Sequence, residues 1–369
     1  MRRWILAGLV ALCCVPAVRS AQAGDDERVK KLIVQLLKDQ DVKKRRAAVF
    51  ALEIDGVRAK GVLQALQVAL EKDSEPVVRQ EVAACLGRMG EDAKDAVPNL
   101  AFALRNDKDD KTRELAARAL LQMVPYSKRA LQQLTEALQD SYPPTRAAAA
   151  EVIKELGEQS KTAVPKLIEF LKAGKDKKTD ATARMFVALA LGRVGAEGKA
   201  GTAVLGEILV DLGEDVLVRE AAADSIARLG LDAEPATKHL VEALGNPQTE
   251  VVVRLAIVKA LAKVQGETKL VWPALKVALG HNDSTLRVQS VRAAGPYGRE
   301  EQEVIKVLAK MARNDENVEV RLAAIQELGL LEGAAKEAEP DLRHLFENDE
   351  REAVRQAAEV ALKKIKGSP

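Results

Sequence analysis

The sequence predicts an all-α solenoid built from about ten tandem helical hairpins. Three observations lead to this prediction. An arginine recurs at nearly constant spacing along the 369 residues. The apolar residues around each arginine follow the period of an α-helix. Aromatic residues make up only 3% of the chain, whereas Ala, Leu and Val are abundant, a composition that suits closely packed helices better than a β-sandwich.

The N-terminal segment is set apart from the repeats. Two arginines precede an apolar run from Trp4 to Val15, and Ala21-Gln22-Ala23 gives a small-x-small cleavage site before Gly24. This is the layout of a secretory signal peptide. We therefore expect residues 1–23 to be a signal peptide and residues 24–369 to form one solenoid, exported to the periplasm or the extracellular space. The apolar run is short for a transmembrane helix, so no membrane span is expected after cleavage, and an uncleaved anchor is the alternative.

Removal of the leader changes the charge and the cysteine count. The 57 Lys and Arg residues fall to 54 against 55 Asp and Glu residues, so the formal charge moves from +2 to −1. Two of the three cysteines are lost, which leaves Cys85 with no partner for an intramolecular disulfide. The near-neutral charge and the shortage of aromatic residues argue against nucleic acid as a partner.

The second helix of each hairpin, helix B, is predicted from the arginine phrase. With the arginine at position 0 and 100° per residue, positions −1, +3, +6, +7 and +10 fall on one face and are mostly Val, Ala and Leu. The phrase often ends in Leu-Gly, as in Ala190-Leu191-Gly192. The anchor arginines, 33 to 38 residues apart, are Arg45, Arg79, Arg113, Arg146, Arg184, Arg219, Arg254, Arg287, Arg321 and Arg355.

The first helix, helix A, is predicted from a second apolar pattern upstream, as in Val97–Leu104 and Val164–Leu171. Prolines stand where a first helical turn tolerates them, and glycines follow helix B where a left-handed C-cap is expected. The unit is therefore helix A, short turn, helix B, short turn. The prolines are Pro98, Pro165, Pro273 and Pro340, and the glycines are Gly90, Gly157, Gly195, Gly230 and Gly298.

Two units depart from this plan. The gap between Arg146 and Arg184 is the longest, and Lys172–Lys178 is predicted to be a protruding basic loop. In the eighth unit Ala294-Gly295-Pro296 replaces the usual Leu-Gly ending, so its helix B is expected to stop early.

An aspartate lies six residues before the arginine in six of the ten units. Together with the Val-Arg pair, the small-residue pair and the Ala-Leu-Gly ending, it makes the chain resemble HEAT repeats, specifically the short repeats of the phycobilisome-lyase-like subgroup. The resemblance covers about residues 28 to 366 and implies an all-α, right-handed α-solenoid, an alpha-alpha superhelix of about ten HEAT-like hairpins.

The resemblance further implies a ladder of Asp–Arg side-chain hydrogen bonds between adjacent repeats. In the middle of the chain the ladder is open to question, because Lys178, Gly213, Gln248 and His281 replace the aspartate, with Asp180, Asp215 and Asp283 nearby. The expected ladder residues are Asp73 with Arg79, Asp107 with Arg113, Asp140 with Arg146, Asp315 with Arg321, and Asp349 with Arg355.

No catalytic, cofactor-binding or metal-binding residue is predicted, and the chain is not expected to be an enzyme. Some HEAT-like enzymes, the deoxyhypusine hydroxylases, hold iron with His-Glu dipeptides, but the three histidines here precede Leu240, Asn282 and Leu345. Cys85 lies on the apolar face of its helix, so it is predicted to be a buried structural thiol.

In HEAT-type stacks the B helices line the concave side. Position +1 is mostly apolar from the fifth to the ninth unit, and charged residues at position +5 flank it, as a protein-binding groove would show. The alternative is that neighbouring B helices bury these residues between them. The candidate partner-binding residues are Met185, Leu189, Leu255, Lys259, Val288, Arg292, Leu322 and Gln326.

The sequence thus predicts an exported, monomeric scaffold that binds a protein or peptide through its B-helix face. The subgroup resemblance provides the alternative, a bilin lyase or isomerase that binds a tetrapyrrole. The identity of the partner cannot be predicted from the residues.

Overall fold

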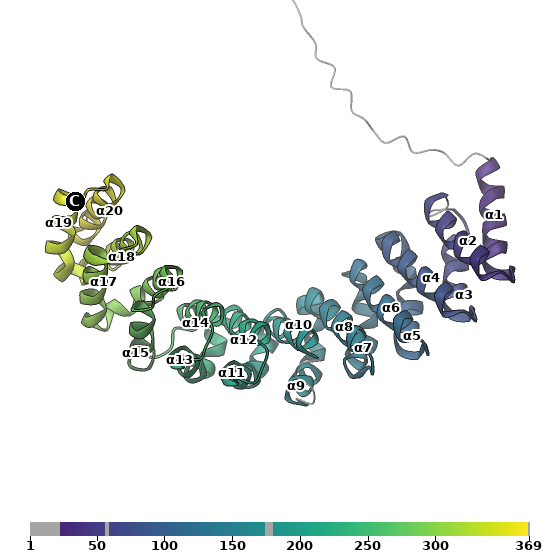
Figure 1. Cartoon of the computed structure of the whole chain (residues 1–369), viewed down its shortest axis with the longest axis horizontal. Coiled ribbons are helices and arrows are strands. Elements are labelled where there is room, and N and C mark those ends of the chain that lie inside the picture. The colour runs from purple at the N-terminus through teal and green to yellow at the C-terminus, as the bar shows by residue number, and fades with distance from the viewer. Residues whose placement is uncertain (1–22, 56–58, 174–179, 368–369) are drawn as a thin grey trace, which may run out of the picture.

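The protein is an elongated, curved stack of helical hairpins (Figure 1). The computed structural model describes residues 23–55, 59–173 and 180–367, within which every regular element is an α- or 3₁₀-helix. Most of the predicted leader (residues 1–23) and most of the predicted basic loop lie outside these residues. Each anchor arginine falls in one B helix, so the predicted all-α solenoid of ten hairpins is confirmed.

The A helices form the outer, convex layer of the arc in Figure 1. They are α1 (Ala23–Lys38), α3 (Val62–Lys72), α5 (Val97–Asn106), α7 (Leu131–Glu136), α9 (Val164–Ala173), α11 (Thr202–Val210), α13 (Thr237–Gly245), α15 (Thr268–Leu279), α17 (Gln302–Asn314) and α19 (Glu339–Asn348).

The B helices form the inner, concave layer of the same arc. They are α2 (Val42–Asp55), α4 (Pro76–Met89), α6 (Asp110–Gln122), α8 (Pro143–Leu156), α10 (Ala181–Leu191), α12 (Val216–Leu229), α14 (Val251–Val264), α16 (Ser284–Ala294), α18 (Val318–Leu330) and α20 (Glu352–Lys366). The eighth B helix, α16, does stop early, at Ala294 before Pro296.

The core runs continuously between the two layers. Leu86, Leu120, Leu191 and Leu328, one from each of four B helices, are fully buried. Each B helix packs on its own A helix and on the B helices of the adjacent repeats. Burial therefore depends on neighbours along the stack, as in other repeat proteins.

The links between repeats are not simple turns but 3₁₀-helices in most cases. Gly90 ends α4 with φ 56° and ψ −123°, a backbone conformation that residues other than glycine rarely adopt. The 3₁₀-helix η1 (Gly90–Ala96) follows and buries Ala93 and Ala96 three residues apart, the period of a 3₁₀-helix. Similar segments are η2 (Tyr126–Ala130), η4 (Gly157–Ala163), η5 (Gly195–Gly201), η6 (Gly230–Ala236), η7 (Gly295–Arg299) and η8 (Glu332–Ala338), while η3 (Ala137–Gln139) extends α7.

Two details of the predicted caps are wrong. Pro273 lies inside α15, because the link after α14 is only Gln265 to Glu267 and α15 starts at Thr268. Gly298 is part of η7 and has no positive φ, because α16 has already ended at Ala294.

Candidate functional site

The anchor arginines connect adjacent repeats through a planar, two-point hydrogen bond. Arg79 donates from Nε and Nη2 to the two carboxylate oxygens of Asp107 in the next repeat, each at 2.7 Å. Its Nη1 donates to the backbone carbonyl of Asp73 in its own repeat, at 2.9 Å. Asp73 in turn accepts the backbone N–H of Glu75 and so fixes the turn between helices A and B. One aspartate therefore serves both the turn and the preceding repeat.

The ladder arginines thus pair with the aspartate of the following repeat and not with the aspartate of their own repeat. The arginine reaches the carbonyl of its own aspartate and the carboxylate of the following one. The hydrogen bonds to Asp107 raise the pKa of Arg79 above its usual value, against the opposing effect of burial. Two-point pairs of this kind are Arg45 with Asp73, Arg113 with Asp140, and Arg287 with Asp315, whereas Arg146 contacts a single carboxylate oxygen of Asp180.

The last two arginines are held more loosely. Arg321 lies 3.8 Å from a carboxylate oxygen of Asp349, too far for a hydrogen bond, although its Nη1 donates to the carbonyl of Asp315. Arg355, in the last of the ten described hairpins, donates to the backbone carbonyls of Asp349 and Glu350. The ladder therefore weakens toward the C-terminal end.

Two glutamates that the aspartate spacing did not predict extend the ladder into the central repeats, as far as Arg219. Arg184 pairs with the buried Glu214, and Arg219 donates from Nη1 to Glu250 at 2.8 Å. Arg254 pairs with no carboxylate among the described residues. It donates to the carbonyls of Leu244, Asn246 and Thr249, and burial lowers its pKa.

The acidic residues near the missing positions have different roles. Asp180 accepts from Arg146, whereas Asp215 and Asp283 accept backbone N–H groups as N-caps of α12 and α16. The available signal for the ladder was an acidic residue four or five residues before the next arginine, as in Glu250 before Arg254.

The predicted apolar row lies on the concave side, half-buried between neighbouring B helices. Its apolar members, Met185, Leu189, Leu255, Val288 and Leu322, all pack against the core with part of each side chain accessible. The charged and polar members, Lys259, Arg292 and Gln326, are exposed. Packing therefore buries one side of each apolar residue and leaves the other accessible, and binding of a partner by this row stays a prediction.

The row ends in an open pocket between α18 and α20. This pocket has a volume of about 530 Å³ and includes the predicted residues Leu322 and Gln326. Leu330 and Val360, which also line it, are 54% and 53% exposed. Lys364 stands on the α20 side of the lining. Two large apolar side chains left half-open in a concave surface are suited to receiving an apolar group of a partner.

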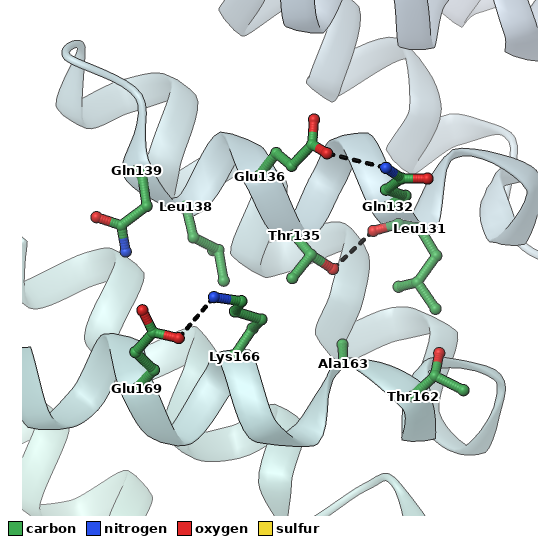
Figure 2. A pocket seen from close by; sticks show the side chains of 10 residues that line it. All are labelled: Leu131, Gln132, Thr135, Glu136, Leu138, Gln139, Thr162, Ala163, Lys166 and Glu169. Carbon is green, nitrogen blue, oxygen red and sulfur yellow. Dashed lines mark hydrogen bonds and ion pairs between the residues drawn. The ribbon is translucent and has the colours of Figure 1, made fainter.

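A second pocket, of about 620 Å³, lies on the convex side between α7 and α9 (Figure 2). Its polar side chains bond within their own helices: Lys166 with Glu169 at 2.7 Å, and Gln132 with Glu136 at 3.0 Å. None of the buried polar atoms that lack a partner belongs to this pocket. The pocket therefore offers space but no unsatisfied group aimed at a ligand.

The other chemistry-bearing residues are structural in their surroundings. Cys85 is fully buried, as predicted, and burial together with the nearby Glu53 carboxylate raises the pKa of its thiol to about 12. Across the described part of the chain, no group of three His, Cys, Asp or Glu side chains is suited to a metal ion. Within the same residues, no helix is both long and apolar enough to cross a membrane.

Comparison with known proteins decides the family. The family model described as HEAT repeats matches residues 29–121, 97–184 and 271–363, together about two thirds of the chain. The chain belongs to the HEAT-repeat family. A search of curated proteins found no match to this HEAT-repeat chain.

Solved structures share the fold at low sequence identity. An engineered protein of the Northeast Structural Genomics Consortium matches with a TM-score of 0.59 and 19% identity, over 92% of this chain and 99% of that one. Kap121p matches with a TM-score of 0.57 and 13% identity, over 94% of this chain. The HEAT-repeat chain spans 42% of the length of Kap121p. Kap121p bound to the extreme C-terminus of the protein phosphatase Cdc14p matches with a TM-score of 0.57 and 13% identity, over 92% of this chain and 42% of that one.

Proposed function

We propose that this chain is an exported, non-enzymatic scaffold that binds a protein partner on the concave face of its B helices and acts as a monomer outside the cytoplasm. The observation that carries the proposal is the half-buried apolar row that ends in the open pocket lined by Leu330 and Val360. The Arg–Asp ladder supports it, because regular inter-repeat bonds hold successive B helices at a constant spacing and so preorganise a long surface.

The solved neighbours give the proposal a precedent. Kap121p has the same fold and has been solved bound to Nup53p, with a TM-score of 0.51 to this chain, and bound to the extreme C-terminus of Cdc14p. Those partners belong to Kap121p. For this chain we carry over only the use of a solenoid as a protein-binding surface. Membership of the phycobilisome-lyase-like subgroup remains part of the proposal and rests on the aspartate and Val-Arg motifs.

Partner retention tests the proposal. The mature chain, residues 24–369, is immobilised and exposed to an envelope extract of the source cells. We expect specific proteins to be retained, and we expect the double variant Leu330→Asp, Val360→Asp to lose them. The matched control is Phe102→Asp, Val277→Asp, two apolar residues of the A helices that are 55% and 63% exposed. Retention that is equally strong in both double variants would contradict binding by the concave face.

Two simpler measurements test the rest of the proposal. Intact mass of the protein from fractionated cells should show a start near Gly24 outside the cytoplasm, whereas a Met1 start in cytoplasmic material would contradict export. Light scattering should give the mass of one chain. A visible absorption band in the purified protein would instead favour the tetrapyrrole-binding alternative.

A further inference from the structure

The cations of the concave face are paired in one half of the stack and unpaired in the other. In the first five repeats, one basic residue lies between positions +1 and +9 after each anchor arginine, on the B helix in four repeats and just after α10 in the fifth, and each is ion-paired. Three of these pairs connect neighbouring repeats, so a carboxylate of the chain accompanies each of these cations. The pairs are Arg46 with Glu81, Arg88 with Glu53, Arg118 with Glu114, Lys154 with Glu155, and Arg193 with Glu155, at distances of 2.6 to 3.1 Å.

In the last five repeats, most basic residues at the same positions lack an ion-pair partner among the described residues. Lys363 pairs with Glu359 at 2.7 Å. Every other basic residue at these positions is exposed and makes no ion pair with a described carboxylate. These five residues, which we call the open cations, are Arg228, Lys259, Lys263, Arg292 and Lys364.

Two carboxylates lie near the open cations but offset them only in part. Lys259 acts on Glu220 and Arg292 acts on Glu327, in each case favouring the charged carboxylate. Burial outweighs this attraction, so the pKa of Glu220 is raised and the pKa of Glu327 is raised to about 7. Neither glutamate forms an ion pair with its neighbouring cation, in contrast to the paired carboxylates of the N-terminal half.

Apolar groups accompany the open cations at one-turn spacing. Leu255 precedes Lys259 by four residues, Val288 precedes Arg292 by four, and Val360 precedes Lys364 by four. Residues four apart lie on the same face of a helix. Each of α14, α16 and α20 thus presents an apolar contact beside a free cation, and the pocket between α18 and α20 lies at the end of this series.

From this pattern we propose that the concave face of α14 to α20 binds an extended acidic segment of a partner protein, whose carboxylates meet the open cations and one of whose apolar side chains enters the pocket at Leu330 and Val360. Packed helices lie ~8–10 Å apart, so four B helices span ~24–30 Å. An extended chain advances ~3.3 Å per residue, so the bound segment is about eight to nine residues long. This inference rests on the proposed function and adds the chemistry of the partner.

Fluorescence anisotropy with the mature chain provides the test. The probe is a labelled peptide of about nine residues in which one Leu follows each pair of acidic residues. We expect it to bind, and a peptide with Lys in place of the acids not to bind. The variant Lys259→Glu, Arg292→Glu, Lys364→Glu should weaken binding about tenfold or more, because three attractions become repulsions. Raising salt from about 0.05 to about 0.3 M should also weaken it.

The matched control is Lys238→Glu, Lys269→Glu, Lys310→Glu. These residues lie on the A helices α13, α15 and α17, are exposed, and make no ion pair with a described carboxylate. The control has the same change in net charge, and we expect its affinity for the acidic peptide to stay within about twofold of that of the unmodified chain, since distant exposed charges are screened.

Several results would overturn the inference. The acidic peptide could fail to bind, or the two triple variants could bind it equally well. A single-stranded oligonucleotide or an anionic vesicle could bind more tightly than the peptide, with loss of that binding in the concave variant, which would assign the surface to another polyanion. The triple variant of Lys259, Arg292 and Lys364 could also retain the same cellular partners as the unmodified chain. In that case the proposed acidic segment is wrong, while the scaffold proposal stands.

Discussion

At the scale of single residues, the anchor arginine combines two structural roles, as Arg79 shows. Its Nη1 donates to a carbonyl of the turn in its own repeat, and its remaining N–H groups donate to a carboxylate of the next repeat. The fixed, planar set of donors makes this combination specific to arginine. A lysine can bind the carbonyls but cannot reproduce the two parallel bonds to Asp107.

This reasoning predicts the stability of four variants. Arg79→Lys and Arg113→Lys should each lower the free energy of unfolding by about 1–3 kcal/mol, because a partly buried carboxylate loses its two-point partner. Arg219→Lys and Arg254→Lys should cost less, because neither arginine forms a two-point bond to a carboxylate. Arg219 is buried but donates once to the 43% exposed Glu250 and otherwise to neutral groups, the carbonyl of Leu209 and Oγ1 of Thr249. Arg254 donates to three backbone carbonyls.

Chemical denaturation of the four single variants checks this order. Asp107→Asn serves as the companion to Arg79→Lys, since it disturbs the same pair from the other side. Equal losses in all four arginine variants would show that backbone carbonyls, rather than carboxylates, provide most of the stabilisation.

A second prediction concerns Glu327, whose carboxyl occupies the space above Gly295 between α16 and α18. Because burial raises its pKa to about 7 from 4.5, the folded state binds the proton more tightly than the unfolded state. The stabilisation is complete below pH ~4.5 and is lost as the pH rises through ~7. Glu327→Gln should therefore match the unmodified chain at pH ~5 and exceed its unfolding free energy by about 1–2 kcal/mol at pH ~8.

Urea unfolding at several pH values measures the effect of Glu327→Gln. Glu319→Gln, on the exposed side of the same helix, is the control and should follow the unmodified chain. A constant difference between Glu327→Gln and the unmodified chain across the pH range would contradict the prediction.

At the scale of elements, the close approach of two neighbouring B helices in the middle of the stack depends on Gly192, eight positions after Arg184. A Cβ added to Gly192 of the fifth repeat would lie 2.7 Å from the Cα of Ser225, which belongs to the B helix of the sixth. The nearest atom is backbone, so the neighbouring helix itself would have to move.

The corresponding prediction compares two glycines. Gly192→Ala should lower the free energy of unfolding by about 1–3 kcal/mol through overpacking. Gly245→Ala, at the end of α13 with no atom within 4 Å of the added Cβ, should change it by less than about 0.5 kcal/mol. Thermal denaturation distinguishes the two, and similar midpoints would mean that the α10 and α12 helices separate at no cost.

The same contacts explain which features could be predicted from the sequence. The hairpins follow from a local pattern, namely the arginine spacing with its apolar period, and the Asp–Arg ladder was expected from the resemblance to HEAT repeats. The pairing of Arg184 with Glu214 could not be predicted in this way, because the turn conformation determines which acidic residue faces the preceding repeat. The 3₁₀ links had a signal, since Gly90, Ala93 and Ala96 are three residues apart, but the segment is too short for a helical period to stand out.

The exposure of the candidate site was harder to predict. A helical wheel places Leu255 and Leu322 away from the core of their own repeat, yet both are half-buried because neighbouring B helices cover them. The pocket at Leu330 and Val360 depends on the spacing between α18 and α20. The burial of these residues and the shape of the pocket depend on contacts between repeats, which the residue pattern of a single repeat does not contain.

At the scale of the whole molecule, stability is distributed along one dimension. Each repeat packs on its own partner helix and on its neighbours, and the ladder repeats this pattern with one bond pair per junction. Two junctions differ: the ninth and tenth repeats are joined only by the looser contact of Arg321 with Asp349, and the junction between the seventh and eighth repeats has no carboxylate pair among the described residues. Arg254 binds only carbonyls of its own repeat, and the link from Gln265 to Glu267 is not a 3₁₀-helix. At this junction the two repeats are held together by the packing of α14 on α16 and of α13 on α15.

This arrangement predicts how a local defect spreads. Leu328→Ala removes a fully buried side chain of α18 and should destabilise its surroundings by about 2–5 kcal/mol. Because neighbours transmit the loss and the junction before the eighth repeat lacks a ladder pair, hydrogen exchange should accelerate from α15 to α20 and stay unchanged from α2 to α12. Leu120→Ala, in the third repeat, should instead accelerate exchange around α4 to α8 and leave α16 to α20 unchanged. Uniform acceleration along the chain in either variant would mean that the solenoid unfolds as one cooperative unit, and the missing pair at Arg254 would then have no consequence for how the repeats are coupled.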